Sequence, residues 1–131
     1  MVAVKILHTC LNVSDLDRSI EFYTRFMGLK FVSRREVKHN NAEIAFLQDD
    51  GGAAIELTRW RDKKNLTEGD NFDHIAFAVK NIKATVDELK GKGVTVAMEP
   101  FLLGESSSRI AFVKDPDGNW LELIESAQSS N

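Results

Sequence analysis

The chain has 131 residues, about the length of one ordinary domain, so a large multidomain enzyme is not expected. The apolar share of 43% and the charged share of 28% are typical of globular proteins and argue against disorder along the whole chain. The net charge of −3 provides no basic field for a phosphate backbone, which argues against nucleic acid as a partner.

The sequence also argues against a membrane or secreted protein. No apolar run reaches the roughly 20 residues of a membrane-spanning helix, and the first five residues lack the layout of a signal peptide. Cys10 is the single cysteine, so an internal disulfide and a cysteine zinc cluster are excluded. We therefore expect a cytoplasmic protein that has no membrane partner.

The first half of the chain contains one predicted helix between predicted strands. Val, Ile, Leu and Thr are frequent over residues 4–13, which predicts a strand. Ser14 is the predicted N-cap of the following helix, with Asp17 as an acidic variant of the capping box, and Gly28 ends the helix. Three further strands are predicted over 29–36, 42–48 and 53–58. The helix has apolar residues at the period of one face: Leu16, Ile20, Tyr23 and Met27.

The second half repeats this order. A predicted strand over 73–79 leads to a predicted helix over 81–90, and further strands are predicted near 94–98, 109–114 and 119–125. Residues 45–57 align with 111–123 at an offset of 66, and the same offset aligns both first strands and both helices. Because chance similarity rarely keeps one offset across such different elements, we predict an α+β fold of two tandem βαβββ modules. The modules are about 4–58 and 73–125, within one domain spanning 1–131.

Two histidines and two glutamates occupy equivalent positions in the two modules. His8 and His74 lie on the first strands and Glu56 and Glu122 on the last, and each pair is separated by 66 residues. A single histidine on a strand is usually a hydrogen-bonded core residue, and a glutamate between leucines often faces solvent, so each residue alone is weak evidence. Together they favour a ligand set, since pseudo-twofold pairing of the modules would bring all four to one point.

A metal ion would explain this combination of side chains. Two buried carboxylates repel each other unless a cation lies between them. Two neutral imidazoles and two carboxylates suit a borderline divalent ion such as Ni²⁺, Co²⁺ or Zn²⁺. Four protein ligands around a six-coordinate ion would leave two positions for water or substrate oxygens.

Several segments resemble glyoxalase I (lactoylglutathione lyase), a branch of the vicinal oxygen chelate superfamily. The similar segments are 8–13, 17–23, 28–29, 55–58, 73–76, 111–118 and 121–124. The first strand and helix alone indicate only the superfamily, whereas the full His–Glu–His–Glu set is more specific to glyoxalase I. The resemblance implies that His8, Glu56, His74 and Glu122 bind one divalent metal ion per site. Ni²⁺ or Co²⁺ is favoured over Zn²⁺ because the short chain resembles the nickel-type members.

The resemblance also implies an activity and an assembly. A glyoxalase I-type lyase converts the hemithioacetal of methylglyoxal and a thiol into a 2-hydroxyacyl thioester through an enediolate, with the metal as Lewis acid. Glu122 would move the proton between the two carbons, and Glu56 would be its counterpart. A homodimer is favoured, in which module one of one chain faces module two of the other.

Other functions of the same fold stay open. An epimerase acting beside a thioester carbonyl uses a similar enolate but typically has Gln where Glu56 stands. An extradiol dioxygenase needs an iron triad without a fourth carboxylate, and a non-catalytic small-molecule-binding or resistance protein commonly lacks the metal ligands. The complete set of four ligands therefore favours the lyase.

Two positions depart from the glyoxalase I pattern. The family usually has an Arg that meets the glutathione carboxylate where this chain has Asn12, and an Asn where it has Trp60. Asn12 cannot form the bidentate charged pair that Arg makes with a carboxylate, and Trp60 offers stacking area and one N–H donor. We therefore expect glutathione to be a poor partner or to be held by another cation. Arg59 and Arg61, close to Glu56 in the sequence, are the candidates.

Overall fold

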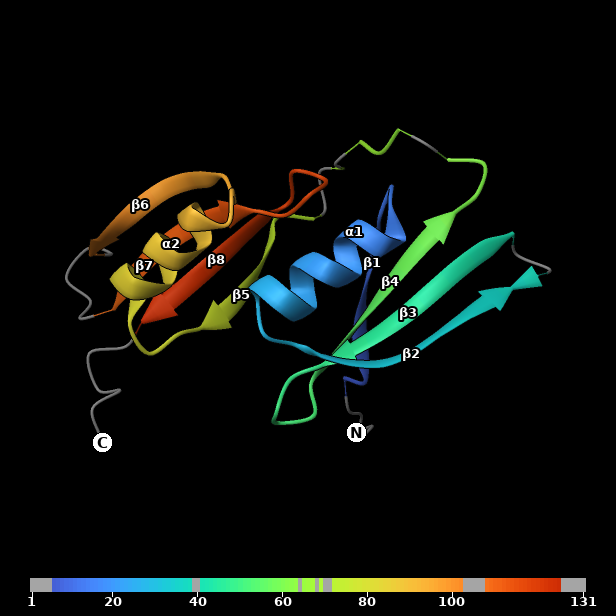
Figure 1. Cartoon of the computed structure of the whole chain (residues 1–131), viewed down its shortest axis with the longest axis horizontal. Coiled ribbons are helices and arrows are strands. Elements are labelled where there is room, and N and C mark those ends of the chain that lie inside the picture. Colours follow the sequence, from blue (N-terminus) through green and yellow to red (C-terminus); the bar gives the residue numbers. More distant parts are fainter. Residues whose placement is uncertain are drawn as a thin grey trace, which may run out of the picture. The chain divides into compact units, whose positions relative to one another are not determined.

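The computed structural model describes residues 6–38, 41–63, 65–67, 69, 72–102 and 108–125. It divides into two compact units, Met1–Thr67 and Glu68–Asn131, which Figure 1 shows with their elements labelled. Each unit has a four-stranded sheet, and the predicted α+β fold of two tandem βαβββ modules is confirmed. Across the described ranges, no helix is long and apolar enough to span a bilayer.

Unit 1 builds a sheet in which its first and last strands are neighbours. Its strands β1 (His8–Asn12), β2 (Lys30–Val37), β3 (Ala42–Gln48) and β4 (Ala54–Trp60) are arranged in the order β1-β4-β3-β2. β1 runs parallel to β4, while the other neighbours are antiparallel. Residues 4 and 5 of the predicted first strand lie outside the described residues. The helix α1 (Leu16–Glu21) connects β1 to β2 and packs on β3 and β4.

The helix of unit 1 has a different cap from the predicted Ser14. Asp15 is the N-cap, and its carboxylate accepts a hydrogen bond of 3.0 Å from the backbone N–H of Arg18. A carboxylate is also favoured over a hydroxyl by the positive end of the helix dipole. α1 continues as a π-helix, η1 (Phe22–Phe26), and the chain leaves it at Gly28, whose φ is +82°.

Unit 2 has the same topology. Its strands β5 (His74–Ala78), β6 (Val96–Leu102), β7 (Arg109–Lys114) and β8 (Trp120–Glu125) follow the order β5-β8-β7-β6, with β5 parallel to β8. The helix α2 (Ile82–Gly91) begins after its N-cap Asn81 and packs against β6, β7 and β8. β6 ends four residues later than predicted. It continues through Pro100 because an edge strand tolerates a residue without an N–H donor.

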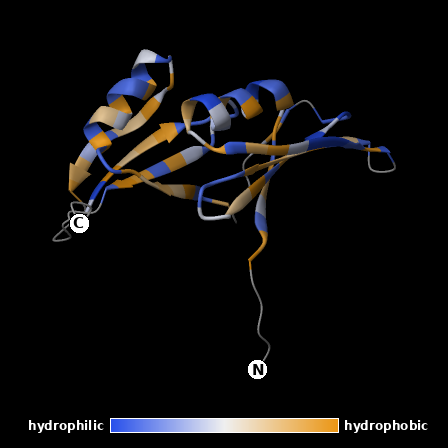
Figure 2. Cartoon of the chain, turned by 60° about the horizontal axis from the view of Figure 1, so that its bottom comes forward, coloured by the Kyte–Doolittle hydropathy of each residue, from blue (hydrophilic) through white to orange (hydrophobic). Residues whose placement is uncertain are grey.

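Alternation along the strands gives each sheet two different faces. Figure 2 shows hydrophilic and hydrophobic residues alternating along both strands and helices. One face lies under the helix and forms the core, where Leu57 of β4 and Leu123 of β8 are completely buried. The neighbouring residues, Glu56 and Glu122, point to the other face, which we call the ligand face. The strand periodicity therefore separates the packing positions from the candidate site.

Candidate metal centre

The candidate ligands of unit 1 lie on two adjacent parallel strands. Cys10 of β1 is in register with Glu56 of β4, and His8 lies two residues before Cys10 on the same face. The His8 Nε2 and Glu56 Oε1 atoms are 3.3 Å apart, and the two side chains are 38% and 19% exposed. Phe46 of β3 packs edge-on against the imidazole, with ring centroids 5.2 Å apart. The pair is thus oriented by the sheet and accessible from solvent.

The candidate ligands of unit 2 repeat this arrangement. Ala76 of β5 is in register with Glu122 of β8, and His74 lies two residues before Ala76. The His74 Nε2 and Glu122 Oε1 atoms are 3.0 Å apart. Phe112, which lies 66 residues after Phe46, packs edge-on against the His74 ring at a centroid distance of 5.6 Å. Both units therefore present the same pair of donors in the same geometry.

The chemistry of these donors fits a divalent metal ion. Asp73 Oδ1 is 2.7 Å from His74 Nδ1, which places a ring proton on Nδ1 and directs the Nε2 lone pair toward Glu122. Two acceptors that face each other need a cation or a proton between them. The hydrogen bond that His74 donates to Asp73 accordingly raises the pKa of His74 against the opposing effect of burial, and the Glu122 charge adds to the rise. Imidazole and carboxylate donors of this kind suit Ni²⁺, Co²⁺ or Zn²⁺.

Each unit contributes two candidate ligands. Within either unit, the residues that the structure describes contain no cluster of three or more His, Cys, Asp or Glu side chains suited to a metal ion. The four predicted ligands are thus divided equally between the two units.

The Glu56 carboxylate is held by two neighbours. The Thr58 hydroxyl donates a hydrogen bond of 2.8 Å to Glu56 Oε2, and the Cys10 thiol donates to the same oxygen at 3.6 Å. Burial raises the pKa of the Cys10 thiol, which keeps it protonated and able to donate. Thr58 is itself only 4% exposed, so its hydroxyl is fixed by the surrounding sheet. These contacts give the Glu56 carboxylate one preferred orientation.

The Glu122 carboxylate lacks such neighbours. The residues at the positions equivalent to Thr58 and Cys10 are Ile124 and Ala76, which carry no side-chain donor. Among the described residues, the hydrogen-bonding and ion-pair contacts of the Glu122 carboxylate are limited to His74. The two glutamates are thus equivalent in position and different in restraint.

The two positions that depart from the glyoxalase I pattern contact each other. The Trp60 indole Nε1 donates a hydrogen bond of 3.0 Å to Asn12 Oδ1. Asn12 is in register with Thr58, so it lies on the ligand face together with Trp60, two residues farther along β4. Because the indole N–H is used by Asn12, Trp60 offers the faces of its ring as contact surface. Both side chains at this end of β1 and β4 are uncharged.

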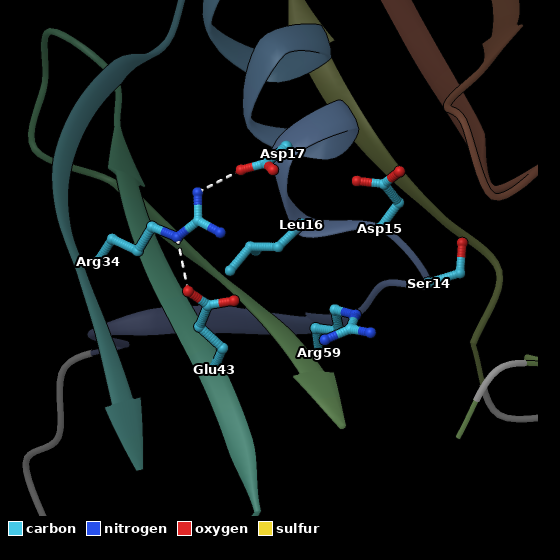
Figure 3. Close-up of a pocket in the computed structure, with 7 residues that line it drawn as sticks. All are labelled: Ser14, Asp15, Leu16, Asp17, Arg34, Glu43 and Arg59. Atoms are coloured by element: carbon cyan, nitrogen blue, oxygen red, sulfur yellow. Dashed lines mark hydrogen bonds and ion pairs between the residues drawn. The ribbon is translucent and has the colours of Figure 1, made fainter. Parts of the chain in front are cut away.

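The two predicted cations of the substrate site lie on the opposite face. Strand alternation directs the Arg59 side chain away from the Glu56 side chain and under α1. The Arg61 Nη2 atom is 2.7 Å from Glu36 Oε1. This placement does not favour either arginine as a contact for a substrate bound at Glu56. Figure 3 shows the pocket of about 280 Å³ that Arg59 lines with Ser14, Asp15, Leu16, Asp17, Arg34 and Glu43.

Three side chains that support the His–Glu pairs are not among the residues predicted from the sequence. These are Phe46 and Phe112, which pack on the two imidazoles, and Thr58, which holds Glu56. The offset of 66 does align the two phenylalanines, and the alternation of β4 places Thr58 beside Glu56 on the ligand face. The missing information is which strands are neighbours, since β1 and β4 are far apart in the sequence.

Two βαβββ units, each with a His and a Glu on adjacent parallel strands, define a vicinal oxygen chelate protein. The family model described as the Glyoxalase/Bleomycin resistance protein/Dioxygenase superfamily matches residues 5–123, and the chain belongs to that superfamily. A protein of Vibrio cholerae named probable lactoylglutathione lyase is 42% identical over 128 residues, which cover 95% of this chain and 93% of that protein.

Solved structures of glyoxalase I are similar to this chain. Glyoxalase I from Zea mays superposes with a TM-score of 0.85 at 34% identity, over 95% of this chain and 45% of that one, so this chain spans about half the length of the maize chain. A glyoxalase I from Leishmania major, described as trypanothione-dependent, gives a TM-score of 0.79 at 29% identity, over 94% of this chain and 87% of that one. The predicted resemblance to glyoxalase I is confirmed, and with it the prediction of an enzyme.

Proposed function

We propose that this chain forms a metal-dependent lyase of glyoxalase I type, which isomerises the hemithioacetal of methylglyoxal and a thiol to a 2-hydroxyacyl thioester. The observation that carries the proposal is the His–Glu pair present at the same place in both units, at 3.3 and 3.0 Å. The similarity to proteins named lactoylglutathione lyase supports it, since it extends over nearly the whole chain. The substrate is a small molecule, and the reaction takes place in the cytoplasm.

One divalent metal ion is held by His8, Glu56, His74 and Glu122. The donor set suits Ni²⁺, Co²⁺ or Zn²⁺, and the resemblance to the nickel-type members favours Ni²⁺ or Co²⁺. When bound, the ion supplies Lewis acidity to the adjacent oxygens of the substrate. The chain is a homodimer, in which His8 and Glu56 of one subunit and His74 and Glu122 of its partner complete each site.

The reaction is an internal proton shift that needs no oxidant or reductant. The hydroxyl proton passes from one oxygen to the other, and the hydrogen on the carbon attached to sulfur moves to the neighbouring carbonyl carbon. Glu122 is the base that takes and returns this proton, because its carboxylate has fewer restraining contacts than that of Glu56. Glu56, held by Thr58 and Cys10, acts chiefly as a ligand.

The thiol site differs from the usual glutathione site. Asn12 and Trp60 bind each other and leave no charge at the position where a carboxylate would meet Arg in the family pattern. The thiol is either a different one or is held by a cation elsewhere in the chain. The example of a trypanothione-dependent glyoxalase I at 29% identity shows that the thiol varies between relatives of this fold.

The experiment is a metal-reconstitution and turnover screen. The full chain is stripped with a chelator and reloaded with Ni²⁺, Co²⁺ or Zn²⁺. Bound metal is measured by elemental analysis, and thioester formation is followed with methylglyoxal and several thiols. We expect one ion per site, metal-dependent turnover, and loss of both in Glu56→Ala and His74→Ala but not in Glu88→Ala, an exposed glutamate of α2. Metal binding at wild-type strength in Glu56→Ala and His74→Ala, or loaded protein without turnover of any thiol adduct, would contradict the proposal.

A further inference from the structure

An arginine of unit 1 lies on the ligand face, three strands away from β1. Arg35 of β2 is in register with Ile44 of β3, Ile44 with Thr58 of β4, and Thr58 with Asn12 of β1. Residues in register on neighbouring strands point to the same side of a sheet, so these four form one row across the ligand face. Thr58 donates its hydrogen bond to Glu56. Arg35 therefore shares a surface with the candidate metal ligands.

Arg35 is also a cation that has no partner among the described residues. It is exposed, and no hydrogen bond or ion pair engages it anywhere in the described ranges. The other strand cation on this face, Lys30, is 2.9 Å from Asp50 Oδ1 and is thereby neutralised. The remaining arginines of these strands and the turn after them lie on the opposite face: Arg34, Arg59 and Arg61. Arg35 is thus the available positive charge of the ligand face in the described strands of unit 1.

The distance from Arg35 to the metal pair suits the remote end of a substrate. Neighbouring strands are about 4.8 Å apart, so the backbones of Arg35 and Thr58, two strands apart, are separated by about 10 Å. The side chains between them, Ile44 and Phe46, are apolar and offer no competing charge. A thiol adduct bound beside the candidate metal ligand Glu56 would extend across these apolar side chains, and an acidic group at its far end would reach the guanidinium.

We propose that Arg35 determines the thiol specificity of this enzyme by binding a carboxylate in the part of the substrate remote from the reacting carbons. This inference rests on the proposed function. A guanidinium binds a carboxylate through two parallel hydrogen bonds, and the neighbour of Arg35 in register on β3 is the apolar Ile44. Arg35 supplies from β2 the charge that Asn12 does not supply from β1. The thiol is therefore an acidic one, in spite of the neutral Asn12–Trp60 pair.

The test compares two adducts of the same thiol, one with free carboxylates and one in which both carboxylates are blocked as uncharged ethyl esters. Steady-state kinetics are measured with the methylglyoxal adducts of glutathione and of glutathione diethyl ester, on wild type, Arg35→Met, Arg35→Lys, Arg59→Met and Arg25→Met. We expect Arg35→Met to raise the KM of the acidic adduct about ten-fold or more, with little change in kcat and none for the ester. Arg35→Lys recovers part of the loss. Arg25→Met removes the same charge from the exposed surface of η1 and changes neither KM.

Three results overturn the inference. They are an unchanged KM in Arg35→Met, an equal rise for both adducts, and a carboxylate-dependent rise in Arg59→Met in place of Arg35→Met. If wild type turns over neither adduct, calorimetry with the unreactive S-hexylglutathione tests Arg35 alone, and the proposed function is contradicted only when no other thiol adduct is turned over. Binding that weakens about ten-fold in Arg35→Met supports the carboxylate contact. Equal binding in both proteins, or no binding by wild type, overturns it.

Discussion

Thr58 gives the Glu56 carboxylate a contact that the Glu122 carboxylate does not have, because residue 124 is isoleucine. A ligand carboxylate that accepts a hydrogen bond from a buried hydroxyl keeps its orientation and binds a metal ion more strongly. A carboxylate that contacts only a histidine turns at lower cost, which suits a group that takes up a proton. The neighbours of the two glutamates therefore determine their roles more than their equivalent positions do.

Replacing Thr58 with valine removes the hydroxyl at nearly constant volume. We expect the affinity for the metal ion to fall about ten- to a hundred-fold, since losses of that size follow removal of hydrogen bonds to metal ligands. The kcat at saturating metal should change much less. Chelator competition gives the affinity, and Thr85→Val on the surface of α2 is the control. A fall in kcat without a fall in affinity would show that Thr58 acts on the reaction and not on the ligand.

Exchanging each glutamate for glutamine separates the ligand from the base. At saturating metal we expect Glu122→Gln to lower kcat by about 10²–10⁴, the usual contribution of a general base. Glu56→Gln should chiefly weaken metal binding and retain more of kcat. The measurement is steady-state kinetics over a range of metal concentrations, with Glu88→Gln as the control. Equal losses of kcat in both variants would contradict the division of roles.

At the scale of the elements, the observed bounds of the strands and helices agree closely with the predicted ones where a single residue pattern dominates. The helix α2 begins after Asn81 and covers the predicted residues, because its cap and its apolar face agree. The predicted N-cap of α1 is wrong by one residue. Ser14 and Asp15 are both good capping residues, and only the backbone geometry distinguishes them. Arg35 could not be assigned to the ligand face in advance, because the register shift between Phe31 and Ser33 changes which residues of β2 share a face.

Two glycines next to helix ends should respond in opposite ways to alanine. Gly28 has a φ of +82°, which disfavours any residue with a Cβ, so Gly28→Ala should destabilise the protein by roughly 1–2 kcal/mol. Gly91, the last residue of α2, has open space around it and no positive φ, so Gly91→Ala should stabilise by about 0.4–1 kcal/mol. Urea unfolding of both variants measures the change. If the free energy of unfolding changed in the same direction in both variants, the different backbone conformations described for Gly28 and Gly91 would be contradicted.

The ion-pair cluster of Arg34 should make stability depend on pH. Arg34 pairs with Asp17 of α1, and its Nε is 2.8 Å from Glu43 Oε2 of β3, a hydrogen bond that lowers the pKa of Glu43. Glu43 binds its proton more tightly in the unfolded chain than in the folded chain. The stabilisation by the ion pair is therefore complete above the ordinary pKa of glutamate. It is lost as the pH falls through the lower pKa of the folded state. The cluster therefore joins the helix to the sheet most firmly at neutral pH.

Glu43→Gln measures this contribution directly. We expect the variant to be less stable than wild type by about 0.5–1 kcal/mol at neutral pH. The difference should disappear in acid, below the lowered pKa, where Glu43 is protonated in both folded and unfolded chains. Urea unfolding at a series of pH values gives the two curves. A difference that stays constant down to acid pH would assign the effect to packing and not to charge.

At the scale of the whole molecule, the ligand set is divided equally between the units, and the proposed homodimer makes each site from two subunits. Chains with His8→Ala or with His74→Ala should each be inactive. After equal mixing and subunit exchange, half of the dimers are hybrids. Each hybrid has one site with both lesions and one with neither, so activity should return to about a quarter of wild type. Mass spectrometry of the intact dimers verifies the exchange, and verified hybrids without activity would show that the sites are not shared.

The unequal surroundings of Glu56 and Glu122 also bear on how such a chain evolves. In a protein made of identical single modules, every substitution next to one glutamate is repeated next to the other, so both carboxylates change together. A tandem duplication removes this constraint, because residue 58 and residue 124 are encoded separately and mutate independently. Threonine in one copy and isoleucine in the other record that freedom. Selection can then improve metal retention in one half of the chain and proton transfer in the other without a compromise between them.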